Sequence, residues 1–383
     1  MTSSPPWLQP RAAYIHIPFC AHHCGYCDFA VTAGQDQLID LYLEALGLEF
    51  AGLGEPQPVE TIFLGGGTPT YLSVPQLERL LTDVRKWLMG TEPHTVAEFS
   101  IESTPDSITP EKIAVLADFG VNRISIGVQT FQAHLLPVLD RIHAAEQIAP
   151  AIKMARQRMP HLSLDLIFGI PGQTLAEWDA DLQEAIALGS DHLSTYGLTY
   201  EKGTPIWKQR ERGQIRAQDE EREREMYLLA IDRLTAAGFE HYEISNFARP
   251  GCRCRHNEIY WANHAYYGFG VGAARYVQGH RELNVRNTKD YIRKMFAGES
   301  PTFQTEYLED EERARETMAI QLRHCDGIDR EAFHLQTDFH IDRLEGAKIA
   351  QYVQLGLLED TGQRIRLTRE GKCVADGIVA GLL

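Results

Sequence analysis

The sequence of 383 residues has no apolar run of about 18 residues, the length that a membrane-spanning helix requires. Basic residues are also in deficit, because 37 Lys and Arg stand against 53 Asp and Glu, which gives a formal net charge of -16. A surface of that sign repels a phosphate backbone, so we expect no nucleic-acid partner. Residues 1–11 contain no hydrophobic signal core. We therefore expect a cytoplasmic protein without an integral membrane segment.

Cysteine is scarce as well. Seven cysteines, an odd number in a large chain with no export signal, argue against a disulfide framework. We expect these thiols to be free or bound to metal. The composition is otherwise that of a folded globular protein, because 44% of the residues are hydrophobic and 23% are charged.

Short β-rich runs alternate with longer amphipathic runs from residue 13 to about residue 240. The predicted strands cover residues 13–17, 61–64, 98–101, 123–127, 163–168 and 192–197. Such alternation is typical of βα units around a parallel sheet. We therefore predict an α/β fold, a complete or partial (β/α) barrel, with its functional groups where the strands end.

The pattern changes after residue 240. We predict an N-terminal tail over residues 1–12, the barrel over 13–240, a junction over 241–300 and a smaller C-terminal α+β module over 301–383. In that module a helical pattern at 310–322 is followed by two short strands around a turn at 361–363. Helices with a terminal hairpin resemble a winged-helix module. Because the chain is acidic, we favour a structural or partner-docking role over DNA binding.

Three cysteines, Cys20, Cys24 and Cys27, lie just after the first predicted strand. Three thiolates on one loop form a site for a soft metal, and a four-iron cluster with three cysteine ligands keeps one iron open for chemistry. The alternative is a structural zinc site with His22 or His23 as fourth ligand. Closed zinc sites usually combine two separated ligand pairs, so the spacing favours the cluster.

This motif, with its context from Tyr14 to Phe29, resembles the radical SAM superfamily, in which the open iron is chelated by the methionine part of S-adenosylmethionine. A glycine-rich segment after the second strand, Gly65-Gly66-Gly67-Thr68, matches the same superfamily. Glycines there let the backbone approach a ligand and offer amide donors to a carboxylate or a ribose. The resemblance implies a radical SAM partial barrel with a 4Fe-4S cluster and bound S-adenosylmethionine.

Further polar residues stand in the order seen in the coproporphyrinogen-oxidase-like branch of that superfamily. A carboxylate at a barrel mouth can bind ribose hydroxyls or an ammonium group, and an arginine can grip a carboxylate. By resemblance, the S-adenosylmethionine pocket is lined by Tyr14, Tyr26, Gly66, Gly67, Thr68, Glu102, Gln129, Arg141 and Asp165. The last three of these are expected to reach a second bound molecule.

Two features separate the members of this branch. The oxygen-independent coproporphyrinogen III oxidases carry a fourth cysteine two residues after the third, where this chain has Phe29, and a long N-terminal extension. The segment His256-Asn257-Glu258-Ile259-Tyr260-Trp261 instead matches the His-Asn-x-x-Tyr-Trp signature of the HemW-type haem chaperones. The resemblance therefore implies a chaperone that receives haem from a donor and passes it to respiratory haem proteins. The alternative is the oxidase itself, which converts propionates to vinyl groups.

The signature suggests a haem site. A neutral imidazole is a common axial ligand of haem iron, so we expect His256 to bind haem, with Tyr260 and Trp261 packed against the porphyrin. The alternative is a domain junction in which these residues bond backbone and fill a core. Cys252 and Cys254 would share one face with His256 in an extended segment and could then hold a metal. No catalytic residue is assigned, and peripheral membrane contact and a homodimer are left open.

Overall fold

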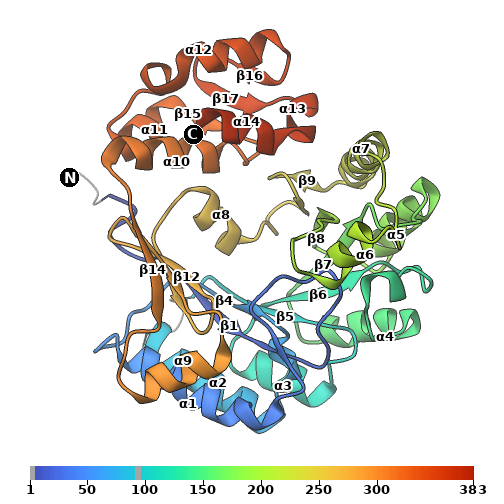
Figure 1. Ribbon diagram of the computed structural model, residues 1–383, viewed down its shortest axis with the longest axis vertical. Helices are drawn as coiled ribbons and strands as arrows, with labels where there is room; N and C mark the ends of the chain where they lie inside the picture. The colour runs from blue at the N-terminus through green and yellow to red at the C-terminus, as the bar shows by residue number, and fades with distance from the viewer. Residues whose placement is uncertain (1–4, 91–95) are drawn as a thin grey trace.

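The computed structural model describes residues 5–90 and 96–383. Within these residues the largest sheet has 12 strands in the order β14-β13-β12-β11-β1-β4-β5-β6-β7-β8-β10-β9 (Figure 1). Its parallel centre consists of β1 (Ala12–Ile17), β4 (Thr61–Gly66), β5 (Glu98–Ser103), β6 (Arg123–Gln129), β7 (His161–Phe168) and β8 (His192–Gly197). All six predicted strands are present in one parallel sheet, which confirms the α/β fold class. Their carboxyl ends meet along one rim.

The sheet extends beyond these six strands on both sides. On one side lies β11 (Tyr266–Phe269), parallel to β1, followed by the antiparallel β12 (Ala274–Val277), β13 (His280–Asn284) and β14 (Thr302–Tyr307). On the other side lie β10 (Asn246–Ala248) and β9 (Glu240–His241), also antiparallel. The region expected to be a junction thus supplies strands to the main sheet, and the expected module boundary at residue 301 precedes the last of them. Pairing over so great a sequence distance leaves no local pattern.

The outer face of the parallel sheet is covered by helices (Figure 1). They are α1 (Ile39–Ala51), α2 (Val74–Leu88), α3 (Pro110–Asp118), α4 (Ala145–Arg156), α5 (Leu175–Ala187) and α7 (Glu220–Ala236). Local chemistry sets where they begin: Ser73 and Gln76 form a capping box at α2, and Thr109 accepts a bond from the Lys112 backbone N–H at α3. The two helix starts follow from neighbouring residues alone.

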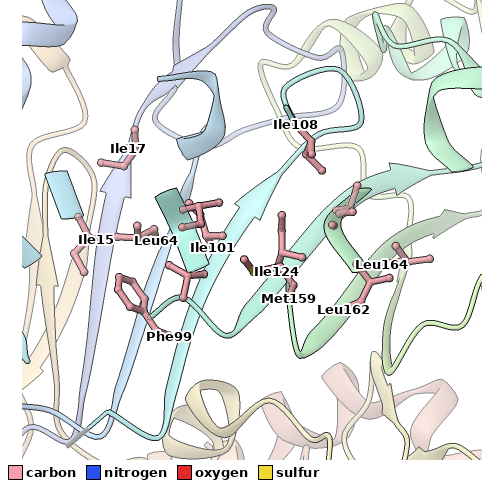
Figure 2. Packing of buried hydrophobic residues seen from close by; sticks show 14 of the residues in the cluster. Ile15, Ile17, Leu64, Phe99, Ile101, Ile108, Ile124, Met159, Leu162 and Leu164 are labelled. Carbon is pink, nitrogen blue, oxygen red and sulfur yellow. The ribbon is translucent and has the colours of Figure 1, made fainter. Parts of the chain in front are cut away.

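Successive side chains along each strand alternate between the hydrophobic core outside the barrel and the lumen inside it. On β5 the buried apolar side chains Phe99 and Ile101 belong to the main core, which continues across Ile15, Ile124 and Leu164 (Figure 2). Because successive side chains of a strand point to opposite faces, the polar residues between them face the other way, into the barrel. On β5, β6 and β7 the inward set is Glu98, Ser100, Glu102, Arg123, Ser125, Gln129, Ser163 and Asp165. The lumen is therefore polar rather than filled with aliphatic side chains.

The C-terminal module has its own core, built around Met318, Phe333 and Ile365. Its helices are α10 (Asp310–Gln321), α11 (Arg330–Thr337), α12 (Ile341–Gln354), α13 (Arg369–Cys373) and α14 (Ala375–Leu382), and its strands are β15 (Ile328–Asp329), β16 (Leu358–Asp360) and β17 (Arg364–Leu367). The hairpin predicted around residues 361–363 is present as β16 and β17. Among the described residues no helix is both long and apolar enough to cross a membrane.

Candidate functional site

The loop that carries the three cysteines follows β1 and is closed at its base by a small parallel pair, β2 (Phe19–Cys20) and β3 (Thr32–Ala33). The ring of His16 supports the loop from below, because its Nε2 lies 3.0 Å from the carbonyl oxygen of Ala30. This arrangement holds the cysteines at the carboxyl end of the barrel.

A cavity of about 540 Å³ opens between this loop and the strand ends. Eleven of the predicted site residues line it: Cys20, Cys24, Tyr26, Cys27, Gly66, Gly67, Thr68, Glu102, Gln129, Arg141 and Asp165. Tyr14 is not among the residues lining this cavity in the described chain. Its hydroxyl lies 3.0 Å from Nδ1 of His16, and its ring stacks on Phe63. In this structure Tyr14 supports the histidine beneath the loop, and its place in the S-adenosylmethionine pocket stays a prediction.

The three cysteines are half-buried, and their sulfur atoms have few hydrogen-bond donors. Thr68 Oγ1 donates to Cys20 Sγ at 3.6 Å, and Arg141 Nη1 donates to Cys24 Sγ at 3.3 Å. Burial raises the pKa of Cys20 to about 12 and that of Cys27 to about 11. These two thiols are therefore protonated in the metal-free protein, and a metal centre must displace their protons to bind.

The geometry argues against the zinc alternative. In residues 5–90 and 96–383, no three His, Cys, Asp or Glu side chains converge closely enough to hold a single ion. His22 Nε2 instead lies 3.1 Å from a carboxylate oxygen of Asp140, and His23 Nε2 donates to the carbonyl oxygen of Cys27. A four-iron cluster takes its thiolates at separate corners, so three spread cysteines around one cavity fit it.

The glycine-rich segment allows β4 to approach the base of the cysteine loop. Gly66 has a positive φ of 105°, and a Cβ there would collide with the His16 ring. A Cβ on Gly67 would lie 2.7 Å from the carbonyl oxygen of Ile17. The amides of this segment bond within the chain: Gly66 N–H donates to Glu102 at 2.8 Å, and Gly67 N–H donates to Ile17 at 2.9 Å. The expectation that these amides are free for a ligand is therefore wrong.

Two carboxyl groups lie deep in the cavity. Burial raises the pKa of Glu102 to about 8, and the nearby Asp165 adds to the shift, while one N–H bond from Gly66 opposes it. Burial also raises the pKa of Asp165, which accepts a bond from Ser125 Oγ at 3.0 Å. Carboxyl groups with so few donors can bind hydroxyl groups or an ammonium group of a ligand.

The end of β6 is irregular where it meets the cavity. The register against β7 shifts between Gly127 and Gln129, and Gln129 has a φ of 69°. Such a bulge re-aims a side chain, and a left-handed conformation at a residue other than glycine costs energy, so both features are typical of functional sites. Arg141 Nη2 donates to the carbonyl oxygen of Gly127 at 2.7 Å.

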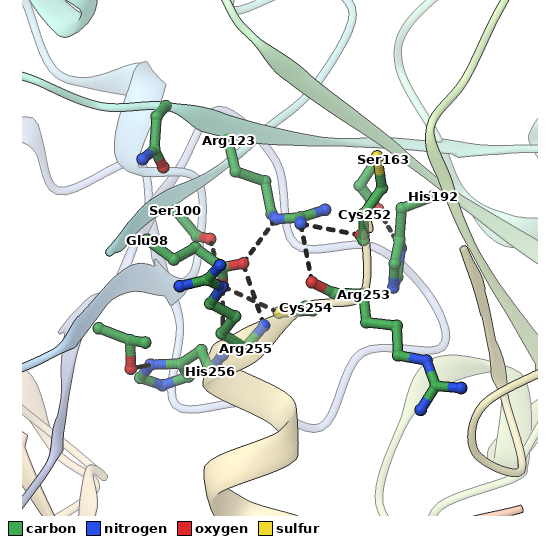
Figure 3. A network of polar contacts seen from close by, with 12 residues as sticks. Glu98, Ser100, Arg123, Ser163, His192, Cys252, Arg253, Cys254, Arg255 and His256 are labelled. Carbon is green, nitrogen blue, oxygen red and sulfur yellow. Dashed lines mark hydrogen bonds and ion pairs between the residues drawn. The ribbon is translucent and has the colours of Figure 1, made fainter. Parts of the chain in front are cut away.

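His256 lies at the opposite end of the barrel, in α8 (Arg255–Trp261). The start of this helix closes the lumen: Glu98 accepts bonds from the backbone N–H groups of Arg255 and His256 and forms an ion pair with Arg123 at 3.1 Å (Figure 3). The side chain of His256 is 1% exposed. Its Nδ1 lies 2.9 Å from Thr61 Oγ1 and its Nε2 lies 2.8 Å from Tyr260 Oη.

Both ring nitrogens thus lie within hydrogen-bond distance of side chains of the protein, which favours the domain-junction alternative over haem ligation by His256. The same network accounts for the neighbouring cysteine. Cys254 donates from Sγ to Glu98 at 3.2 Å, and burial raises its pKa well above the ordinary value. Because α8 begins at Arg255, Cys252, Cys254 and His256 do not form the extended array that could have held a metal.

Several residues of the cavity were not singled out by the sequence analysis, and His143 is one of them. His143 is 3% exposed and lines the cavity, and its ring nitrogens have no hydrogen-bond partner in the part of the chain that the structure describes. Burial and the charge of Arg141 lower its pKa to about 4, so the ring is neutral. No motif marks this histidine. The inward serines Ser125 and Ser163, by contrast, could have been found from strand alternation.

Comparisons with known proteins agree with this site. Residues 14–185 match the Radical SAM superfamily, and residues 308–374 match the HemN C-terminal domain. The Heme chaperone HemW of Bacillus subtilis is 36% identical over 97% of this chain and 99% of its own length. The Heme chaperone HemW of Escherichia coli is 38% identical over 70% of each chain.

The fold also matches a solved structure. Coproporphyrinogen III oxidase (HemN) from Escherichia coli superimposes with a TM-score of 0.85 over 99% of this chain and 91% of its own, at 24% identity. This likeness concerns the fold, while the sequence matches identify the family. The chain belongs to the HemW family of radical SAM proteins.

Proposed function

We propose that this protein is a haem chaperone that carries a 4Fe-4S cluster and binds S-adenosylmethionine. The observation that carries the proposal is the similarity along nearly the whole chain to proteins named Heme chaperone HemW. The cargo is haem, which the protein receives from a donor and passes to respiratory haem proteins.

Cys20, Cys24 and Cys27 would hold the cluster, and the fourth iron would face the cavity. When bound, the cluster supplies an electron and an open iron site for a chelating ligand. Glu102 and Asp165 would take the ammonium or hydroxyl groups of S-adenosylmethionine, and Arg141 would take its carboxylate. Gln129 and Tyr26 complete the wall of this pocket.

The mouth of the cavity suits an apolar planar molecule. Three side chains from different segments line it and remain well exposed: Phe29 at 58%, Ile142 at 57% and Tyr196 at 45%. Exposed apolar groups gathered at one opening are typical of binding sites. We therefore place haem exchange at this end of the barrel, away from His256.

The second candidate function is that of a coproporphyrinogen III oxidase. The fold of HemN favours it, but similarity at 24% identity carries the fold alone. Phe29 stands where the resemblance to the oxidases calls for a fourth cysteine. This difference favours the chaperone.

The experiment adds haem and coproporphyrinogen separately to anaerobically reconstituted protein. We expect a Soret band that titrates with haem and moves to an added apo-cytochrome, and no protoporphyrinogen above the level of a cluster-free control. Protoporphyrinogen formation without haem transfer would replace the chaperone with the oxidase.

A further inference from the structure

Arg141 is held at two points in the wall of the cavity. It follows Asp140, whose backbone is left-handed with a φ of 56°, and its own N–H donates to the Leu136 carbonyl at 3.0 Å. Its side chain donates from Nη2 to the Gly127 carbonyl at 2.7 Å and from Nη1 to Cys24 Sγ at 3.3 Å. Backbone and guanidinium are thus both fixed, and the planar group presents one edge to the sulfur atom.

The three sulfur atoms differ in their donors. Cys24 receives its bond from a cation, whereas Cys20 receives a longer bond, 3.6 Å, from the neutral hydroxyl of Thr68. Cys27 receives a backbone N–H bond from Phe29. A charged donor makes a stronger hydrogen bond than a neutral one. Among these three contacts, the one to Cys24 is therefore the charged one and the strongest.

A hydrogen-bond donor to a sulfur atom that ligates an iron-sulfur cluster stabilises the reduced cluster, because the reduced cluster carries more negative charge. Reduction adds one electron to an iron-sulfur cluster, and hydrogen bonds to its sulfur atoms are among the factors that set its reduction potential. In a buried site a nearby positive charge acts more strongly than it would in water. Loss of the Arg141 cation should then make reduction harder.

We propose that Arg141 is a positioning residue for the cluster, and that its bond to Cys24 Sγ raises the reduction potential of the cluster. The inference rests on the proposed 4Fe-4S cluster. It adds a role for Arg141 that is separate from binding the carboxylate of S-adenosylmethionine, because Nη1 is directed at the sulfur while Nε has no partner among the described residues.

The test compares full-length wild type with Arg141→Gln, Arg141→Lys and Thr68→Val after anaerobic reconstitution. Arg158→Gln is the control, because Arg158 is an exposed arginine that pairs with Asp118 at the surface. Iron and sulfide are quantified first. The midpoint potential is then measured by redox titration with electron paramagnetic resonance of the reduced cluster, without added S-adenosylmethionine.

We expect all variants to carry the iron and sulfide of wild type. Arg141→Gln should shift the midpoint to a more negative value, and Arg141→Lys should shift it less, because the charge remains while the two-point anchor is lost. Thr68→Val should shift it less than Arg141→Gln, and the control should match wild type.

Two outcomes would overturn the inference. One is a fully loaded Arg141→Gln protein with the wild-type potential. The other is failure of both Arg141 variants to bind full iron, which would make Arg141 necessary for loop structure rather than for potential. An iron-free wild type would instead refute the proposed cluster itself, so the two failures are distinguishable.

Discussion

Two glutamates on β5, four residues apart, mark the two ends of the barrel. Burial alone would raise the pKa of Glu98, but the charge of Arg123 and the N–H groups of Arg255 and His256 outweigh burial and lower it below its ordinary value. Glu102 has one N–H donor, from Gly66, and burial raises its pKa to about 8. The same residue type on the same strand is thus fully paired at one end and nearly unpaired at the other.

The two ends of the barrel therefore have different roles: the Glu98 end stabilises the fold, and the Glu102 end surrounds the candidate site. At the Glu98 end the carboxylate accepts bonds from Arg123 and from the start of α8, and these contacts close the lumen (Figure 3). At the Glu102 end buried carboxyls, the buried ring of His143 and exposed apolar side chains surround a cavity. Buried polar groups are costly without partners, so a folded protein keeps them where a ligand supplies the partners.

The largest expected effect concerns the cysteines at the open end. Changing any of Cys20, Cys24 or Cys27 to Ala should abolish a stable four-iron cluster, because the cluster would lose one of three protein ligands. Cys252→Ala is the matched control, since Cys252 lies at the sealed end, where its carbonyl accepts from Arg123. Iron and acid-labile sulfide analysis decides the matter, and full iron in Cys24→Ala would refute the cluster assignment.

The next effect compares the two glutamates directly. Glu98→Gln should lower the free energy of unfolding by about 3–5 kcal/mol, because it leaves the Arg123 charge buried and unpaired. Glu102→Gln should instead raise it at pH 7, because the neutral amide avoids the cost of keeping a carboxyl protonated at a pH where the unfolded chain ionises it. Denaturant unfolding of the cluster-free proteins measures both values. Equal decreases in the free energy of unfolding would show that both glutamates stabilise the fold to the same extent.

The two glutamates, Glu98 and Glu102, should also affect the pH dependence of the free energy of unfolding in opposite directions. Because the pKa of Glu102 is raised to about 8 in the folded protein, the folded protein holds an extra proton above pH 4.5. The contribution of Glu102 to the free energy of unfolding is therefore lost as pH rises toward 8. Its slope is at most about 1.4 kcal/mol per pH unit. The lowered pKa of Glu98 acts oppositely, and its contribution is lost as pH falls below 4.5.

Glu102→Gln should therefore flatten the decline of unfolding free energy between pH 5 and 8, and Glu98→Gln should flatten the decline on the acid side. Unfolding of the cluster-free proteins at a series of pH values measures both slopes. A wild-type slope in Glu102→Gln above pH 5 would contradict the raised pKa of Glu102.

Sequence patterns predicted the parts of the fold that depend on neighbouring residues. Strand alternation located the six parallel strands, and turn residues located the hairpin of β16 and β17. The joining of β11 to β1 was not predicted, because pairing between residues 12 and 266 leaves no local pattern.

The same limit applied to the site. Eleven of the residues that the cysteine spacing and the resemblance to the family predicted line one cavity. The His-Asn-x-x-Tyr-Trp signature indicated the family but not how His256 is held, because the groups that bond His256 include Thr61 and Glu98, which are far away in the sequence. A histidine in a motif can be a ligand or a sealed structural residue, and only its distant neighbours distinguish the two.

Haem titration of wild type against His256→Gln tests most directly the claim that ligands are held at the open end and that the sealed end is structural. Glutamine can keep a hydrogen bond to Thr61 or Tyr260, so the variant should stay folded, as its circular dichroism should show. The account predicts the same Soret maximum and the same affinity for haem in both proteins. A folded His256→Gln protein with a shifted Soret band or much weaker haem binding would contradict it.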